Sequence, residues 1–288
     1  MKLKPFLLYT LFFLAAVLVF IWLLFPQKEA AKYFSHLLNQ YDSKVEFSCE
    51  KVKLQPLLKL SFENSELLIN NNIKIRPESL DIKLNPSFFD NKTKKIVFQS
   101  RLHQGTFNGV LGLKDSNPLL FSKAQFKMSD IKIVHFNYQT DLADMTFSCI
   151  VNGEYNFKGV KGKQTGKGNV FIKDFAAKLS KSLFNTLNLP LVDFSQIKID
   201  FEQQSNIITI TQCVARGPVI NLKLRGKIDM ILPVNNVRLD LTGIILQDSP
   251  YLAKFANMAE IKALAGNILK NGIKFKITGT LNNPNISI

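Results

Sequence analysis

The sequence has few of the residues that most catalytic and metal-binding sites use. Its 288 residues include three histidines and three cysteines, at positions His36, His103, His135, Cys49, Cys149 and Cys213. The histidines are separated by long intervals and no two cysteines form a C-x-x-C pair, so the spacing of a zinc or redox centre is missing. The sequence therefore predicts no metal site and no cofactor.

The same cysteines limit disulfide bonding. Three thiols that lie far apart in the sequence cannot all pair with one another. We expect buried free thiols, and a single disulfide in an oxidising compartment is the alternative.

Familiar catalytic motifs are also missing. There is no G-x-S-x-G nucleophile elbow and no H-E-x-x-H zinc motif, and the Asp and Glu residues are scattered without an evident pair for acid–base work. We therefore predict that the protein is not an enzyme.

One stretch rich in glycine and lysine, VKGKQTGKGNV at residues 160–170, must be compared with a phosphate-binding loop. That motif requires a glycine five residues before Gly166 and a Ser or Thr after Lys167, whereas Lys161 and Gly168 stand there. The flanking segments VNGEYNFKGV and GNVFIKD alternate like strands, although a phosphate loop should open a helix. We expect a β-turn whose glycines supply positive φ and close strand approach.

The sequence lacks a dense basic block, although Lys and Arg outnumber Asp and Glu by 37 to 22 and give a net charge of +15. The lysines are distributed along alternating segments such as VKLQPLLKL and QIKIDF, which is typical of solvated strand faces. We therefore predict no nucleic-acid partner. Beside a membrane, this charge would attract anionic headgroups, at about 1 kcal/mol for each cation near the surface.

Long apolar runs are missing except near the N-terminus, where residues 5–25 carry no charge. This length matches a helix that crosses a ~30 Å hydrocarbon core, and we predict a single-pass anchor over residues 1–26. A cleaved signal peptide is the alternative, but it would have a shorter apolar region and a small-residue cleavage site. Lys2 and Lys4 favour a cytoplasmic N-terminus. The predicted anchor includes Pro5, Phe12, Leu18, Trp22 and Phe25.

The remaining residues, 27–288, begin with a short amphipathic helix in QKEAAKYFSHLLNQ. The period is then two in segments such as KVEFSCEKVKL, FSKAQFKM, VINLKLRGKIDMIL and IKFKITGTL. We predict a mainly β fold, in which an N-terminal transmembrane helix precedes one long, curved, mostly antiparallel β-sheet domain of many short strands. Helical patterns at residues 173–190, and at 249–272 with Ser249 as the cap, add a few short helices.

Several segments resemble known envelope proteins. The C-terminal IKFKITGTLNNPNISI resembles the ending of the AsmA-like family. The anchor, RLHQGTFNGVLGL, NGEYNFKGVKGKQTGKGNVFIKD and GPVINLKLRGKIDMILP together resemble the protein N family of the type II (general) secretion pathway. The resemblance covers nearly the whole chain. It implies a bacterial inner-membrane protein whose β-rich bulk lies in the periplasm, and it supplies no catalytic residues.

The alternating pattern permits two arrangements of the sheet. The apolar side chains face another layer in a closed core, or they line an open groove that accepts acyl chains. The candidates for such a groove are Phe98, Leu102, Phe107, Val110, Ile208, Ile210, Leu222 and Leu224.

The leading hypothesis is a non-enzymatic, inner-membrane-anchored periplasmic component of the type II protein secretion system. Its expected partners are the inner membrane and other secretion-system envelope proteins. The alternative is an AsmA-like factor for lipid transfer or outer-membrane assembly, which binds phospholipid in an apolar β-groove. The sequence leaves the secreted cargo, the direct partners and the oligomeric state open.

Overall fold

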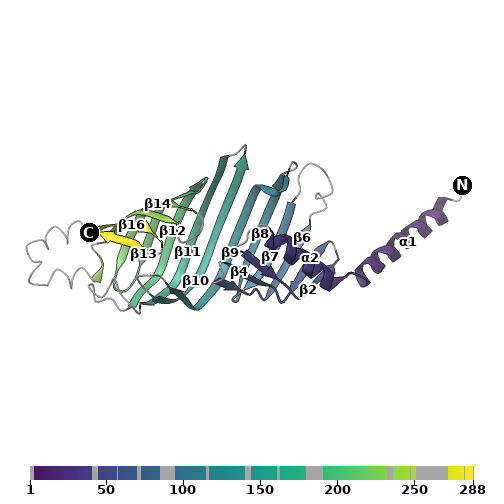
Figure 1. The fold of residues 1–288 in the computed structure, drawn as a ribbon, viewed down its shortest axis with the longest axis horizontal. Helices are drawn as coiled ribbons and strands as arrows, with labels where there is room; N and C mark the ends of the chain where they lie inside the picture. Colours follow the sequence, from purple (N-terminus) through teal and green to yellow (C-terminus); the bar gives the residue numbers. More distant parts are fainter. Residues whose placement is uncertain are drawn as a thin grey trace, which may run out of the picture. The chain divides into compact units, whose positions relative to one another are not determined.

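The computed structural model is mainly β, with a large antiparallel sheet and few helices (Figure 1). This confirms the predicted fold class at that level. The structure describes residues 3–40, 45–56, 58–69, 73–84, 95–114, 117–139, 144–160, 163–179, 191–231, 236–246, 248–250, 272–281 and 283–287.

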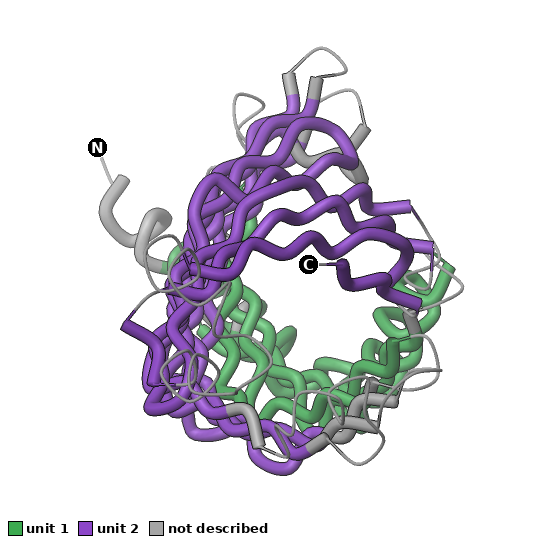
Figure 2. Tube along the Cα trace, turned by 90° about the vertical axis from the view of Figure 1, so that its left-hand side faces the viewer, with its two compact units in different colours: residues 1–102 green, residues 103–288 purple. Residues whose placement is uncertain are grey.

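The chain divides into two units, residues 1–102 and residues 103–288, which are coloured separately in Figure 2. The boundary falls inside the range that the sequence predicts as one periplasmic domain. Unit 1 combines helices with short strands, whereas the described part of unit 2 consists almost entirely of strands.

The first helix of unit 1 is α1 (Leu3–Leu23), and several of its apolar side chains are exposed. Among the described residues, however, no helix combines the length and the apolar character that a membrane span requires. The transmembrane part of the predicted fold is therefore not supported.

Unit 1 contains two groups of antiparallel strands and a second helix, α2 (Gln27–Asn39). The first group has the order β1-β4-β5 and the second the order β2-β3-β6-β7. Their bounds are β1 Val45–Ser48, β2 Lys51–Gln55, β3 Lys59–Glu63, β4 Glu66–Ile69, β5 Ile73–Ile75, β6 Ser79–Leu84 and β7 Lys95–Leu102.

The core of unit 1 lies where α2 and β1 meet the apolar side chains of β2 and β3. The Phe62 ring makes edge contacts with Phe34 on α2 and Phe47 on β1, with centroids 5.5 and 5.9 Å apart. Val52 and Ala31 are almost completely buried in the same cluster. Alternate residues of β2 and β3 therefore face a helix, and this part of the chain forms a closed core.

The strands of unit 2 follow one another in the sheet in the order of the sequence, from β8 to β17, and each pairs antiparallel with the next. Their bounds are β8 Gly105–Lys114, β9 Asn117–Gln139, β10 Asp144–Val160, β11 Lys163–Leu179, β12 Leu191–Gln204, β13 Ile207–Arg216, β14 Asn221–Asp229, β15 Arg238–Ile245, β16 Ile273–Thr280 and β17 Pro284–Ser287.

The sheet of unit 2 is curved, as the purple tube in Figure 2 shows. Three residues with positive φ lie at its register shifts: Asp130 and His135 on β9, with φ of 51° each, and Asp174 on β11, with φ of 50°. At each shift two residues on one strand lie opposite one residue on the next. Such bulges bend a strand and increase its twist.

Two features differ from the sequence-based expectation. Strands β9 to β12 are not short, because they contain 23, 17, 17 and 14 residues. The helical pattern at 173–190 is wrong over residues 173–179, which pair with both β10 and β12. Phe175 and Ala177 alternate there with period two, and sheet pairing decides the conformation. Residues 180–190 and 251–271 lie outside the described part of the chain.

Pro250 is helical, so a helix begins directly after Ser249, the residue that the sequence predicts as its cap, and the Ser249 side chain also bonds to a strand. Its hydroxyl accepts a hydrogen bond from the Asn221 backbone N–H at 2.9 Å and donates one to the Asn221 carbonyl at 3.0 Å. The side chain is nearly fully buried. Ser249 therefore links the segment that follows β15 to the start of β14 through two hydrogen bonds.

Candidate functional site

Strand pairing in unit 2 assigns each side chain to one of two faces, because directly paired residues on antiparallel strands share a face. One row crosses the sheet from β8 to β16, each residue paired with the next. It comprises Gly109, Phe126, Tyr155, Gly168, Phe201, Ile210, Gly226, Leu241 and Ile277. We call the side of unit 2 that contains this row the apolar face.

Aromatic rings dominate the apolar face over β8 to β12. The rings of Phe107 and Phe126 are stacked with centroids 5.9 Å apart, and those of Phe126 and Tyr155 with centroids 6.1 Å apart. Phe201 continues the series, 5.9 Å from Tyr155. The planes of successive rings lie within 18° of parallel. These rings form one ladder across the strands.

Glycines on β11 make room for this ladder. Tyr155 and Phe201 are on β10 and β12, so their rings meet above the strand between them. A Cβ on Gly166 would lie 2.5 Å from Tyr155 Oη, and one on Gly168 would lie 2.5 Å from Phe201 Cζ. The glycine-rich segment is thus part of a β-hairpin, and the predicted close approach is confirmed. Gly166 and Gly168 do not have positive φ.

The apolar face is mostly aliphatic over β14 to β16, where Phe275 is the one aromatic residue. Every position of these strands on that face is apolar or glycine: Leu222, Leu224, Gly226, Ile228, Leu239, Leu241, Gly243, Ile245, Ile273, Phe275, Ile277 and Gly279. Gly226 has φ of 146°, and a Cβ there would lie 2.2 Å from the Asp240 carbonyl oxygen. Most of these side chains are half-buried.

A second aromatic cluster lies toward the other end of β9 to β12. Phe136, Phe147, Phe175 and Phe194 contact one another in that order, with centroids 5.2, 5.8 and 6.2 Å apart. Ala177 pairs with Phe147 and is almost fully buried. The long central strands therefore carry aromatic side chains near both ends.

The opposite side of unit 2, which we call the charged face, carries ion pairs over its central strands. Lys127 and Glu154 are 3.1 Å apart, and Lys167 and Glu202 are 2.6 Å apart. All four side chains are well exposed, so each pair contributes at most about 1 kcal/mol. These pairs neutralise four of the charges on the central charged face, where Lys123 and Lys158 also lie opposite each other.

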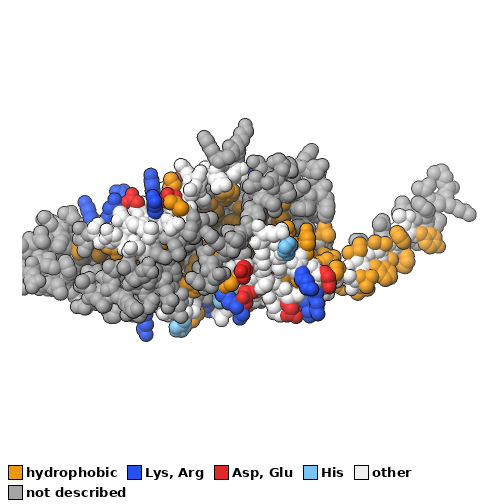
Figure 3. Space-filling view, in the orientation of Figure 1, with side chains coloured by type: hydrophobic (Ala, Val, Ile, Leu, Met, Phe, Trp, Pro, Cys, Tyr) orange, Lys and Arg blue, Asp and Glu red, His pale blue; other side chains and the backbone are white. Residues whose placement is uncertain are grey.

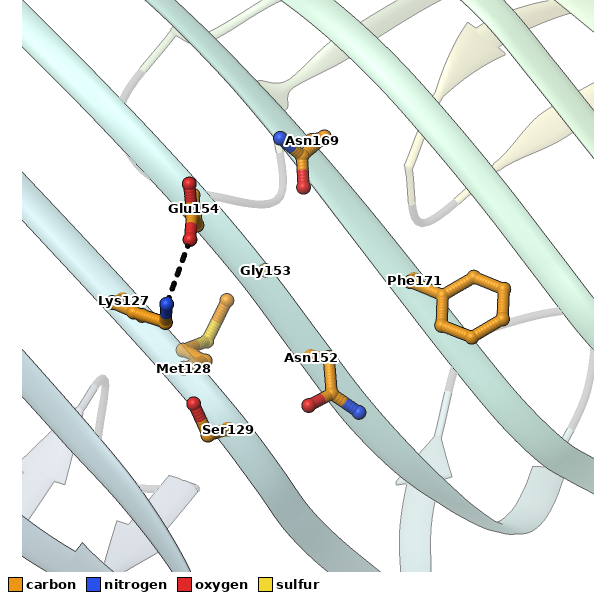
Figure 4. Close-up of a pocket in the computed structure, with 8 residues that line it drawn as sticks. All are labelled: Lys127, Met128, Ser129, Asn152, Gly153, Glu154, Asn169 and Phe171. Carbon is orange, nitrogen blue, oxygen red and sulfur yellow. Dashed lines mark ion pairs between the residues drawn. The ribbon is translucent and has the colours of Figure 1, made fainter.

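A shallow hollow of about 410 Å³ lies over the bulge at Asp130, between β9 and β11 (Figure 4). Lys127 and Glu154 on its rim pair with each other, and Asn152 donates a hydrogen bond to the Asp130 carboxylate at 3.2 Å. Phe171 forms one wall. Its main polar groups are already bonded within the sheet, so the hollow does not define a ligand site.

The titratable groups on the apolar face are kept neutral. Burial raises the pKa of the Tyr155 phenol, which donates a hydrogen bond to Gln203 Oε1. Cys149 and Cys213 lie on the same face, and burial raises the pKa of both thiols. In unit 1 burial also raises the pKa of Cys49. All three cysteines are free thiols, as predicted, but only Cys149 and Cys213 are buried and Cys49 is half-buried.

Five of the eight residues predicted to line a groove lie on one face of unit 2. Phe107, Ile208, Ile210, Leu222 and Leu224 all lie on the apolar face.

The other groove candidates lie elsewhere. Val110 pairs with Gln125 and therefore lies on the charged face. Phe98 pairs with Ile82 in unit 1, and Leu102 ends the same strand. Ile82 packs against the closed core of that unit.

Sequence reasoning missed the ring ladder of Phe126, Tyr155 and Phe201. The available signal was the alternation of aromatic and charged residues in FSKAQFKM, GEYNFKG and IKIDFEQ, opposite the glycines of the central segment.

The predicted anchor residues are described only in part. Phe12 and Trp22 are exposed on α1, at 73% and 51% of their surface. Phe25 packs against the core of unit 1. The side chains of Pro5 and Leu18 lie outside the described ones.

Comparison with known proteins gave no relative: no protein-family model, no curated protein and no solved structure matches the chain. Within the described residues, no three His, Cys, Asp or Glu side chains are placed to hold a metal ion. We therefore take the apolar face of unit 2, which is defined by strand pairing and ring contacts from β8 to β16, as the candidate site.

Proposed function

We propose that the protein is a non-enzymatic lipid carrier of the bacterial envelope that binds acyl chains along the apolar face of unit 2. The observation that carries this proposal is the unbroken row of apolar and glycine residues from Gly109 on β8 to Ile277 on β16. With neighbouring strands ~4.8 Å apart, the row spans roughly 38 Å. An acyl chain fills half of a ~30 Å hydrocarbon core and fits along it.

The burial of the apolar face supports the same function. Phe107, Phe126, Tyr155 and Leu224 are half-buried. The main contacts among the described elements of unit 2 run between neighbouring strands. An acyl chain laid on this face would gain about 0.8 kcal/mol for each methylene removed from water. A curved sheet can follow such a chain along its length.

In this proposal the N-terminal segment holds the protein at the inner membrane, with the bulk of the chain in the periplasm. Exposed apolar side chains of α1, such as Phe12, Phe20 and Trp22, support a membrane-associated segment. Lys2 and Lys4 support a cytoplasmic N-terminus.

A role in the type II secretion system stays a prediction that rests on the layout of the sequence. It requires contacts with other envelope proteins of that system, and in-cell crosslinking would identify them. The apolar face gives the lipid carrier a specific physical basis, so lipid binding is the function to test first.

The test is native mass spectrometry with lipid extraction on the full chain, purified gently from bacterial envelopes. We expect phospholipid to co-purify with the wild-type protein. In the L222N/L224N variant, two amide side chains replace neighbouring leucines of the apolar face, and bound lipid should fall at least tenfold. A folded wild-type chain without lipid would contradict the proposal.

A matched control separates lipid binding from folding. Val110 and Val214 are half-buried on the charged face, and Val214 pairs with Lys223 beside the two leucines. V110N/V214N introduces the same number of amides at similar burial. It should keep its lipid, and circular dichroism should show both double variants folded. Equal lipid loss in the two variants would instead identify a folding defect.

A further inference from the structure

The charged face changes character over β14 to β16. Its positions on these strands include Asn221, Thr242, Ile244, Thr278 and Thr280, together with two carboxylates, Asp229 and Asp240. Cations occupy the remaining six positions, and we call these residues the basic patch: Lys223, Arg225, Lys227, Arg238, Lys274 and Lys276. Six cations and two carboxylates leave a net charge of +4.

The two carboxylates lie directly opposite cations of the patch, Asp229 opposite Arg238 and Asp240 opposite Lys227. Lys276 forms an ion pair with Asp240 at 3.0 Å. For Lys223, Arg225 and Lys227, no carboxylate among the described residues lies within ion-pair distance. On the central strands, Lys127 and Lys167 pair with glutamates on neighbouring strands, whereas Lys123 lies opposite another lysine, Lys158. The basic patch is therefore the part of the charged face where three neighbouring strands carry six cations and two carboxylates.

The basic patch is accessible. Lys223, Arg225, Lys227 and Lys274 are all exposed. Figure 3 shows Lys and Arg side chains (blue) standing out from the surface in the region of β14 and β16 in Figure 1. Alternation on β14 puts its three cations in one line, two residues apart, about 7 Å from each to the next.

We infer that the basic patch docks onto an anionic phospholipid surface. Lipid phosphates in a bilayer form a sheet of negative charge, which an array of lysines and arginines on three neighbouring strands meets at several points at once. A free phosphate would engage only one or two of these cations. The same three strands carry the aliphatic part of the apolar face, so docking would bring the acyl-chain site to a membrane. The role of docking in lipid transfer rests on the proposed function, whereas docking to the membrane does not.

Vesicle flotation with the full chain tests this inference. We would measure binding to phosphatidylcholine vesicles with and without 30% phosphatidylglycerol. Apolar contacts by α1 contribute to both measurements, so the ratio of the two affinities reports the electrostatic part. The wild-type ratio should be at least tenfold, and it should fall toward one at 0.5 M NaCl because salt screens exposed charges. K223Q/R225Q/K227Q should lower the ratio at least tenfold.

The control variant K123Q/K158Q/K178Q removes three exposed cations from other strands of unit 2. It should keep the wild-type ratio, and an equal loss in both triple variants would overturn the inference, since net charge alone would then explain binding. If the β14 triple variant does not fold, K223Q/K274Q tests the same patch on two strands. Inorganic phosphate at constant ionic strength should not compete, and full competition would indicate a free-anion site instead of a docking surface.

Two outcomes distinguish this inference from the proposed function. The basic-patch variants should retain the phospholipid that co-purifies with the chain, because they leave the apolar face unchanged. A protein that carries no lipid but binds anionic vesicles through the basic patch would contradict only the proposed function. A protein that carries lipid but binds both vesicle types equally would contradict only the docking surface.

Discussion

Phe201 extends its ring over the backbone of Gly168 on the neighbouring strand, and a Cβ at Gly168 would lie 2.5 Å from the ring's Cζ atom. The ring thereby reaches Tyr155, which lies two strands away in the sheet. This relationship explains why glycines lie within a long strand, where glycine normally weakens pairing. The rings of Tyr155 and Phe201 require positions without side chains, Gly166 and Gly168, on the strand between them.

Gly168→Ala should therefore destabilise the sheet. The added methyl group would meet both Phe201 and the Glu154 carbonyl oxygen, the latter at 2.8 Å. The backbone oxygen cannot rotate away, so we expect a loss of about 1–3 kcal/mol in the free energy of unfolding. Chemical denaturation of the purified chain measures it.

Gly112→Ala is the matched control for this prediction. The tightest contact of its added methyl would be Ser122 Oγ, at 3.3 Å, and the next are Lys123 atoms at ordinary contact distances of 3.6 and 3.7 Å. Ser122 donates a hydrogen bond to the Gly112 carbonyl, and its side chain needs to shift by only a few tenths of an ångström. Ala also restricts the unfolded chain more than Gly does, so stability should stay within about 1 kcal/mol of the wild type. Equal losses at Gly112 and Gly168 would contradict the role of the ladder.

Alkaline pH should weaken unit 2 through Tyr155. Burial raises the pKa of this phenol in the folded chain, so above its unfolded pKa of about 10 the folded state holds more protons than the unfolded state. Stability conferred by the neutral phenol is complete below that pH and is lost as pH rises toward the folded pKa. Tyr155→Phe should remove this component from a plot of unfolding free energy against pH.

The Tyr155→Phe variant should also show a loss at neutral pH. The phenol donates a hydrogen bond to Gln203 Oε1, and its removal should cost about 0.5–1.5 kcal/mol. An unchanged alkaline profile in this variant would show that another group causes the pH dependence.

Thiol reactivity should report whether lipid covers the apolar face. Cys149 and Cys213 lie on that face with raised pKa values, so little thiolate is present at pH 8 and alkylation should be slow. Extraction of bound lipid should accelerate alkylation of both at least threefold. Mass spectrometry of the labelled peptides measures each rate.

Cys49 is the internal control for the thiol measurement. It packs against the core of unit 1 with its Sγ facing the Ala31 carbonyl oxygen, and it lies far in sequence from the apolar face. Its rate should not respond to lipid extraction. A uniform acceleration at all three cysteines would indicate that extraction loosens the whole chain.

The period-two pattern was sufficient to predict which residues share a face wherever strands are regular. Leu222 and Leu224 alternate with lysine and arginine, and the pairing of β14 confirms the prediction. The prediction fails for Val110, because it lies three residues from Phe107, and an odd spacing on a regular strand reverses the face. The groove candidates are grouped by hydrophobicity, without regard to whether their spacing along the strand is even or odd.

Bulges explain what the sequence could not show. Ile210 and Cys213 are also three residues apart, yet both lie on the apolar face because two residues of β13, Thr211 and Gln212, occupy one register position between them. Nothing in the composition of the segment marks this shift. The stacking of Tyr155 on Phe201 across β11 likewise depends on how β10, β11 and β12 pair. The sequence alone does not specify the register of these strands.

Site-specific photo-crosslinking in living bacteria tests the central claim most directly. A photoreactive amino acid would replace Leu224 on the apolar face or Val214 on the charged face, two positions on neighbouring strands. We predict lipid adducts at position 224 and none at position 214, with both variants folded. Equal adduct formation at the two positions, or protein adducts alone at position 224, would contradict the account that this face binds acyl chains.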